Sequence, residues 1–125
     1  MSELEKKAVA LHSGSPEKAS HLWLRNIGAY VCELEIYVFR DGEQTRIPGT
    51  GKDICVGQSE ELDVGQYGVE EGEMFTAYCN VKLGKDVYGK KWVTYDPNVN
   101  RRANYEATGT TLSDSCNFLG TTARE

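Results

Sequence analysis

Residues 28–39 read Gly-Ala-Tyr-Val-Cys-Glu-Leu-Glu-Ile-Tyr-Val-Phe, and this stretch decides the fold. Apolar side chains recur at every second position, on the face formed by Tyr30, Cys32, Leu34, Ile36 and Val38. Because successive side chains of a strand point to opposite faces, the alternation predicts a long, half-buried β-strand. The opposite face, which carries Glu33 and Glu35, is expected to be solvated.

A second stretch, residues 73–83, alternates in the same way and predicts a second long strand. Shorter strands are expected at 21–26, 43–47, 53–56, 59–64, 92–95, 103–108 and 115–119. Asp41-Gly42 is a hairpin signal, because both central residues of that turn need positive φ. Many short strands separated by turn signals predict an all-β fold, a single antiparallel β-sandwich.

The chain has 125 residues, which suits one domain with one core. Residues 1–19 are expected to form an N-terminal arm, ahead of a β-sandwich binding domain over residues 20–125. Leu4, Ala8 and Leu11 fall at helical spacing in the arm, and Pro16 would end a helix. A short helix and a loose arm remain alternatives, because isolated helices of this length are marginal.

No run of about 18 apolar residues occurs, so no transmembrane span is expected. Residues 1–20 lack the apolar core of a secretory signal, which predicts a protein that is cytoplasmic, exported by another route or supplied in mature form. The cysteines are Cys32, Cys55, Cys79 and Cys116, and their spacing is not that of a zinc site. We expect reduced, buried thiols, no metal and no cofactor.

The net charge of −5 argues against nucleic acid as a partner, because attraction to phosphates needs clustered cations. Residues 82–102 nevertheless hold six cations against two anions, whereas residues 33–73 hold eleven anions against three cations. This asymmetry would suit an anionic ligand or head-to-tail pairing into a homo-oligomer. The alternative is that both regions are simply solvated surfaces.

Catalytic candidates are sparse. The two histidines are His12 and His21, and the sequence has no nucleophile elbow and no phosphate loop. Glu33 and Glu35 would stand roughly 6.6 Å apart along a strand, a separation similar to that of glycosidase carboxylates. An exposed strand lacks the cleft that would separate their pKa values, so we expect no enzyme.

Aromatic and cationic side chains interleave near the predicted loops between residues 88 and 102. The candidate ligand-binding set there is Tyr88, Lys91, Trp92, Tyr95, Arg101 and Arg102. Such rings can stack on a sugar while the cations bind its polar groups. The alternative is that Trp92 belongs to the core and the cations form a solvated rim.

Two short motifs carry a resemblance to a known family. Gly28-Ala29-Tyr30-Val31 opens the long strand, and Gly109-Thr110-Thr111-Leu112 forms a tip near the end of the chain. In order and spacing these motifs resemble the C-terminal membrane-recognition domain of the cholesterol-dependent cytolysins, a β-sandwich, over roughly residues 20–119. The tryptophan-rich loop of that family is replaced by a lysine-containing stretch over residues 79–92.

The resemblance implies a role for Thr111 and Leu112, the positions that match the cholesterol-recognising pair of the family. Stand-alone haemagglutinin-type sandwiches look similar in the same motifs, and they bind glycans. The hypothesis is therefore a non-enzymatic recognition module, lectin-like in its binding of cell-surface glycans. The alternatives are a sterol or lipid-headgroup binder and a structural, self-associating protein.

Overall fold

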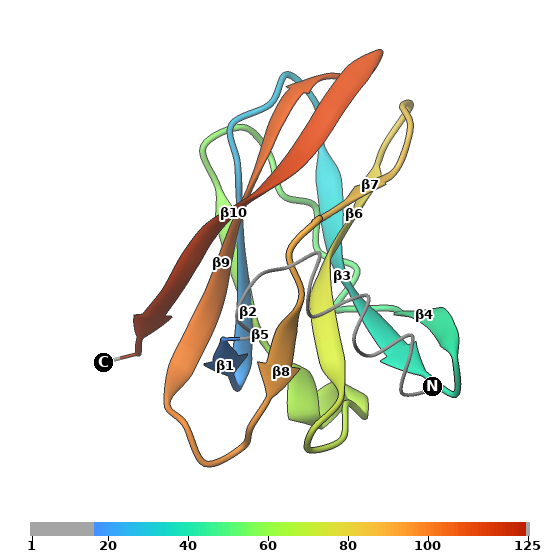
Figure 1. Ribbon diagram of the computed structural model, residues 1–125. Helices are drawn as coiled ribbons and strands as arrows, with labels where there is room; N and C mark the ends of the chain where they lie inside the picture. Colours follow the sequence, from blue (N-terminus) through green and yellow to red (C-terminus); the bar gives the residue numbers. More distant parts are fainter. Residues whose placement is uncertain (1–16, 125) are drawn as a thin grey trace.

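The computed structural model describes residues 17–124, which fold into two β-sheets packed face to face (Figure 1). The first sheet has the order β1-β8-β6-β3-β4, with β7 paired to β6, and the second has the order β10-β9-β2-β5. The strands are β1 (Lys18–Ala19), β2 (His21–Asn26), β3 (Cys32–Arg40), β4 (Glu43–Ile47), β5 (Ser59–Asp63), β6 (Met74–Val81), β7 (Val87–Tyr88), β8 (Val93–Tyr95), β9 (Arg101–Thr110) and β10 (Ser113–Ala123). The expected all-β sandwich is thereby confirmed.

The two long alternating stretches form the centre of the first sheet. β3 and β6 pair antiparallel, with Leu34 opposite Cys79 and Ile36 opposite Ala77. Their inward side chains are at most 3% exposed, and they are Cys32, Leu34, Ile36, Val38, Phe75, Ala77, Cys79 and Val81. Leu22, Leu24 and Tyr105 of the second sheet complete this core. The alternation in the sequence therefore identified the face of each strand that is buried.

Most neighbouring strands of the sandwich pair antiparallel, as expected, but two pairs are parallel. β1 runs parallel to β8, and β2 runs parallel to β9. β2 lies between β9 and β5, although strands of the other sheet separate β2 from both along the chain. Turn signals in a sequence report hairpins between consecutive strands, and they contain no information on pairings between distant segments.

Several strand boundaries differ from those expected. β3 begins at Cys32, and the preceding residues contribute only a single bridge between Ala29 and Thr110. Residues 53–56 form no strand, because Ile54 makes only one bridge, to Cys32. β9 and β10 are longer than predicted because they pair with each other from the turn to Arg101 and Ala123. The turn at Asp41-Gly42 has the expected positive φ angles, 53° and 79°.

The expectation that Glu35 is solvated is also wrong, because only 7% of its surface is exposed. Both nitrogens Nε and Nη2 of Arg46, on the neighbouring strand β4, donate hydrogen bonds to its carboxylate. Asn80 of β6 donates a third hydrogen bond at 3.1 Å. Burial alone would raise the pKa of Glu35, but these donors outweigh it and hold the pKa below its usual value.

Residues 1–16 of the predicted arm lie outside the described residues, whereas Lys18 and Ala19 already belong to the first sheet. All four cysteines are free; Cys32, Cys79 and Cys116 are buried, but Cys55 is exposed. Over residues 17–124, the structure contains no helix of the length and apolarity that crossing a bilayer requires.

Candidate functional site

Four connections meet at one end of the sandwich, the upper end in Figure 1. They are the β2–β3 loop, the segment before β5, the β6–β7 loop and the β9–β10 turn. Backbone hydrogen bonds of 2.7–2.9 Å join them, from Gly57 to Asn26, from Ala29 to Gly109 and from Lys82 to Val31. Segments far apart in the sequence therefore form one continuous end surface.

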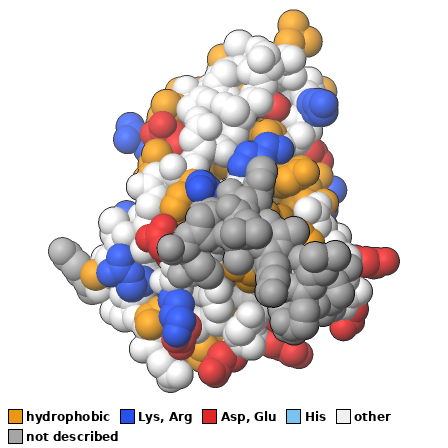
Figure 2. All heavy atoms as spheres, viewed as in Figure 1, with side chains coloured by type: hydrophobic (Ala, Val, Ile, Leu, Met, Phe, Trp, Pro, Cys, Tyr) orange, Lys and Arg blue, Asp and Glu red, His pale blue; other side chains and the backbone are white. Residues whose placement is uncertain are grey.

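Each of these connections carries one large, exposed apolar side chain. They are Ile27, Val56, Leu83 and Leu112, with exposed fractions of 45%, 61%, 101% and 96%, and we call them the apolar tip. Within residues 17–124 the only other such side chain is Leu119 of β10. Figure 2 shows hydrophobic side chains projecting at this end of the molecule. Apolar side chains gathered at one end indicate a contact surface rather than scattered exposure.

Leu112 is presented by a tight turn. Thr110 pairs with Ser113, so Thr111 and Leu112 are the two central residues. The Thr110 hydroxyl oxygen accepts hydrogen bonds from the backbone N–H groups of Leu112 and Ser113, at 3.3 Å each. Gly109 has φ 90°, and a Cβ there would lie 2.1 Å from the Ser113 carbonyl oxygen. The Thr110 hydroxyl and the backbone at Gly109 thus fix the turn without using the leucine side chain.

Leu83 is held in an unusual backbone conformation, with φ 57°. A bulky side chain in the left-handed region costs about 1–3 kcal/mol, and such strain clusters at functional sites. Gly84 follows it, and a Cβ on Gly84 would lie 3.1 Å from the Cα of Thr111. The β6–β7 loop therefore packs directly against the β9–β10 turn, which places two exposed leucines on adjoining loops.

An open depression of about 540 Å³ lies beside Leu83, and Tyr30, Val31 and Thr111 line it. At its rim, Lys82 Nζ is 2.6 Å from Asp53 Oδ1, and this hydrogen bond raises the pKa of Lys82. The Tyr30 hydroxyl donates to the Thr108 carbonyl at 2.8 Å, so its ring contributes apolar surface. The depression is thus mainly apolar, with its charges paired.

A second depression of about 460 Å³ lies between β7 and the β9–β10 turn, and its lining includes Tyr88, Lys90, Leu112 and Asp114. The Lys90 ammonium sits 4.4 Å from the centre of the Tyr88 ring. An aromatic ring beside a cation and a carboxylate can bind a sugar or a polar headgroup. Of the predicted ligand-binding residues, the structure therefore brings Tyr88, Thr111 and Leu112 to this end.

Three predicted ligand-binding residues lie in or beside the first sheet and outside the apolar tip: Lys91, Trp92 and Tyr95. Trp92 is 6% exposed and packs on the outer face of the first sheet, with its ring 4.5 Å from that of Phe39. Tyr95 is a core residue, 9% exposed. The backbone carbonyl of Lys91 accepts a hydrogen bond of 2.6 Å from the hydroxyl of Tyr105. The low exposure of Trp92 thus supports the alternative that its side chain has a packing role.

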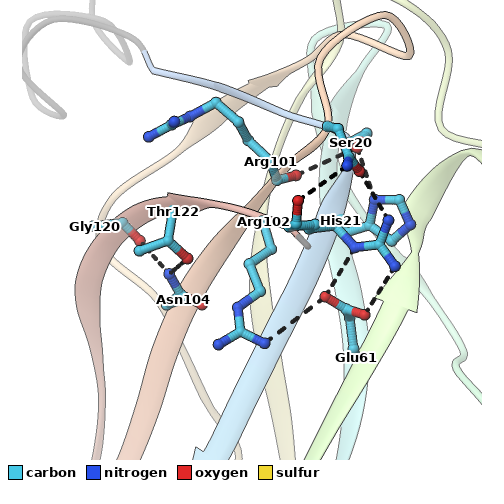
Figure 3. A network of polar contacts seen from close by, with 10 residues as sticks. Ser20, His21, Glu61, Arg101, Arg102, Asn104, Gly120 and Thr122 are labelled. Atoms are coloured by element: carbon cyan, nitrogen blue, oxygen red, sulfur yellow. Dashed lines mark hydrogen bonds and ion pairs between the residues drawn. The ribbon is translucent and has the colours of Figure 1, made fainter.

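Arg101 and Arg102 begin β9 of the second sheet, and the β9–β10 turn of the apolar tip lies at the other end of that strand. Figure 3 shows both arginines in a network of polar contacts with Ser20 and Glu61. Arg101 donates to the Thr121 carbonyl and hydroxyl at 2.9 Å each. Arg102 extends toward Glu61, at 3.9 Å, and its guanidinium lies 4.6 Å from the centre of the Trp23 ring. The structure therefore does not bring Trp92 and these arginines into one pocket.

His21 lies in the same network and makes the contacts nearest to a catalytic arrangement in the described chain. The Ser20 hydroxyl is 2.7 Å from His21 Nδ1, and Asp63 is 3.9 Å from Nε2. That second distance is too long for a hydrogen bond, and Ser20 is only 5% exposed. Burial lowers the pKa of His21, with a further contribution from Arg124. Within residues 17–124, no group of three or more His, Cys, Asp or Glu side chains is placed to hold a metal ion.

Sequence reasoning missed Ile27, Val56 and Leu83 as site residues. A signal was present, because each is a single large apolar residue followed directly by glycine: Ile27-Gly28, Val56-Gly57 and Leu83-Gly84. A turn glycine after a lone apolar residue ends the strand pattern and leaves that side chain at a loop tip.

No protein-family model matches the sequence, and no curated protein matches it. Solved structures do match. Pneumolysin is 19% identical with a TM-score of 0.46, over 81% of this chain and 23% of that protein. Listeriolysin O is 14% identical with a TM-score of 0.46, over 81% and 22%. Intermedilysin, solved with human CD59, is 17% identical with a TM-score of 0.44, over 79% and 23%.

These three proteins are cholesterol-dependent cytolysins, the family whose C-terminal domain the two sequence motifs resemble. This chain spans less than a quarter of the length of each protein. At these identities the likeness concerns the fold alone.

Proposed function

We propose that this chain is a recognition module that docks on a lipid surface through its apolar tip. The observation that carries the proposal is the exposure of Ile27, Val56, Leu83 and Leu112 on four adjoining connections at one end. No single one of them would hold the protein on a membrane, but all four lie on connections that adjoin at one end of the sandwich, so that they can enter a bilayer interface together.

The energetics favour a reversible contact. Full burial of a leucine side chain contributes about 2 kcal/mol, and the partly exposed Ile27 and Val56 contribute less. The gross gain is therefore about 5–7 kcal/mol, from which the cost of association is subtracted. After that subtraction, the apolar tip is expected to bind no more strongly than a single acyl anchor, which itself binds membranes only marginally. Stable residence would need several copies acting together.

The test is co-sedimentation of the full chain with phosphatidylcholine vesicles. We expect wild-type protein to bind, and Leu83→Ser combined with Leu112→Ser to reduce the partition coefficient by at least tenfold. Leu119→Ser is the matched control, because Leu119 is also exposed but lies on β10, outside the tip. Equal binding by the double variant, or no binding by wild type, would refute lipid docking.

Sterol dependence is a finer part of the same proposal, supported by the mainly apolar depression that Thr111, Tyr30 and Val31 line. Vesicles with and without cholesterol separate the two possibilities. Tighter binding in the presence of cholesterol, lost in Thr111→Ala, supports sterol recognition. Equal binding to both vesicles leaves docking on the lipid surface and removes the sterol.

Glycan binding is the second candidate, supported by Tyr88, Lys90 and Asp114 in the depression beside Leu112. This location differs from the predicted cluster around Trp92 and the arginines. A glycan array with wild type and Tyr88→Ala tests it: a signal that the variant loses supports a lectin-like module, and the absence of any signal rules it out.

A further inference from the structure

The β2–β3 loop, residues 27–31, joins two other connections of the apolar tip. The Ala29 N–H donates a hydrogen bond of 2.8 Å to the Gly109 carbonyl, which precedes the β9–β10 turn. The Val31 carbonyl accepts a hydrogen bond of 2.9 Å from the Lys82 N–H, at the start of the β6–β7 loop. The two connections that present the exposed leucines of the tip are therefore both attached to the β2–β3 loop.

The β2–β3 loop is itself held by Asn26, the last residue of β2, which is fully buried. The Nδ2 group of Asn26 donates hydrogen bonds to the Tyr30 carbonyl at 2.7 Å and to the Ile54 carbonyl at 3.0 Å. Its Oδ1 accepts a third hydrogen bond, of 2.8 Å, from the Gly28 N–H. Its backbone carbonyl accepts a fourth, of 2.7 Å, from the Gly57 N–H. One buried residue therefore joins the β2–β3 loop to the segment before β5, the fourth connection of the tip.

The amide of Asn26 is difficult to replace. An asparagine amide has two N–H donors, and both are used here. The acceptors belong to Tyr30 and Ile54, which are 6% and 0% exposed, so water does not reach them in this conformation. A buried carbonyl that is left without a donor carries the full cost of its desolvation. A variant that lacks these donors is therefore expected to open the β2–β3 loop until water reaches the Tyr30 carbonyl.

We propose that Asn26 is the positioning residue of the apolar tip, an inference that rests on the proposed docking to lipid. Because it is buried, Asn26 acts through the side chains that its hydrogen bonds place, which are Ile27, Val56, Leu83 and Leu112. It holds the connections of the tip in one arrangement before any membrane is met. A binding surface that is ordered in advance loses less conformational entropy on association, so it binds more tightly.

The second sheet offers a matched control in Asn104 of β9, which is 5% exposed. Its Nδ2 group also donates two hydrogen bonds, to the Gly120 carbonyl at 3.1 Å and to the Thr122 hydroxyl at 3.0 Å (Figure 3). Both acceptors belong to β10, and neither lies on a connection of the tip. The same substitution at Asn26 and Asn104 therefore removes two buried donors in each case, but only at Asn26 does it release the tip.

The first experiment measures co-sedimentation of the full chain with phosphatidylcholine vesicles, at a temperature where circular dichroism shows each variant to be folded. We expect Asn26→Asp, which keeps the shape and loses both donors, to lower the partition coefficient about fivefold or more. Asn104→Asp should change it less than twofold. Asn26→Ser and Asn104→Ser repeat the comparison without a new charge, since a serine hydroxyl has one donor and can serve only one of the two acceptors. Equal effects at the two positions, or no effect at Asn26, would overturn the proposal.

The second experiment, amide hydrogen exchange without vesicles, separates positioning from general stability. The N–H groups of Ala29, Gly57 and Lys82 report the three contacts between tip connections, and they should exchange at least tenfold faster in the Asn26 variants. The Tyr95 N–H, bonded to the Glu73 carbonyl at 2.8 Å, should keep its rate. Acceleration of all four amides alike would make Asn26 a residue of general stability and contradict the proposal. If wild-type protein bound no vesicles, lipid docking would fail, and the exchange rates would still decide whether Asn26 positions the loops.

Discussion

The buried carboxylate of Glu35 shows how one side chain is governed by strands that the sequence does not place beside it. Its partners, Arg46 and Asn80, come from the neighbouring strands on either side of β3. Glu73 is similar, since its hydrogen bonds with Arg40, 2.6 and 2.8 Å long, hold its pKa below the usual value. Both carboxylates are therefore more stable as anions in the folded state.

The pH dependence follows from the direction of these shifts. A carboxyl whose pKa is lowered by folding contributes stability above its unfolded pKa, about 4.3 for glutamate, and loses it as the pH falls through the lower folded value. We expect Glu35→Gln to lower the free energy of unfolding by about 1–2 kcal/mol at pH 7, because charged hydrogen bonds to Arg46 are lost. Urea denaturation at pH 7 and pH 3.5 measures both values.

Glu33→Gln is the control for this experiment, because Glu33 is only partly buried on the same strand. It should cost less than about 0.5 kcal/mol at pH 7. If Glu35→Gln destabilised the protein equally at both pH values, its effect would come from packing, and the ion pair would not be its cause.

At the scale of elements, the predictable strands are those whose alternation is enforced by burial. β3 and β6 each place an apolar residue at every inward position, so period two was visible without knowing their partners. β10 contains Ser, Asp, Asn and Thr at most of its positions, because it pairs only with β9 at the edge of its sheet. Its length is set by pairing with β9, which leaves no periodic pattern in the sequence.

The same distinction explains what was predictable of the candidate site. Thr111 and Leu112 were found because they belong to the turn motif Gly109-Thr110-Thr111-Leu112, which carries the family resemblance. Trp92 and Arg101 were grouped because they are near in sequence, yet the chain crosses from one sheet to the other between them. Contiguity in a β-sandwich does not imply proximity, and only long-range pairing brings Leu83 beside Thr111.

The β9–β10 hairpin should need glycine at position 109 for steric reasons as well as for its positive φ. Gly109 and Gly120 both have positive φ, 90° and 104°, but only at Gly109 would a Cβ meet backbone, 2.1 Å from the Ser113 oxygen. We expect Gly120→Ala to cost about 1 kcal/mol, or about 4 °C in melting temperature. Gly109→Ala should cost at least about 2 kcal/mol more and weaken vesicle binding, because the turn that presents Leu112 must shift.

Thermal unfolding of the two variants, followed by circular dichroism, separates the conformational cost from the steric one. Equal melting temperatures for Gly109→Ala and Gly120→Ala would mean that the hairpin opens to accommodate the methyl group. In that case the β9–β10 turn would be less rigid than its hydrogen bonds indicate.

At the scale of the whole molecule, the balance of acidic and basic side chains differs between the two ends of the sandwich. The basic stretch predicted for residues 82–102 is divided by the fold, with Lys82 and Lys85 near the tip and the two arginines at the opposite end. Around the tip, the four cations Lys52, Lys82, Lys85 and Lys90 are matched in number by the four anions Glu33, Asp53, Asp86 and Asp114. The opposite end carries the acidic side chains of Asp41, Asp63, Glu70, Glu71, Glu73 and Asp96, and red dominates the lower edge of Figure 2.

A neutral tip and an acidic opposite end predict how docking responds to salt. Because no net charge of the tip faces the membrane, raising sodium chloride from about 50 to about 500 mM should change binding to phosphatidylcholine vesicles less than twofold. Added phosphatidylserine should not strengthen vesicle binding. A basic residue near an anionic surface contributes about 1 kcal/mol, and here the neighbouring carboxylates cancel that attraction. Asp53→Asn with Asp114→Asn makes the tip basic, and it should create salt-sensitive binding to the anionic vesicles. Strong salt dependence of the wild type would instead assign docking to the separated lysines and remove the apolar tip as its cause.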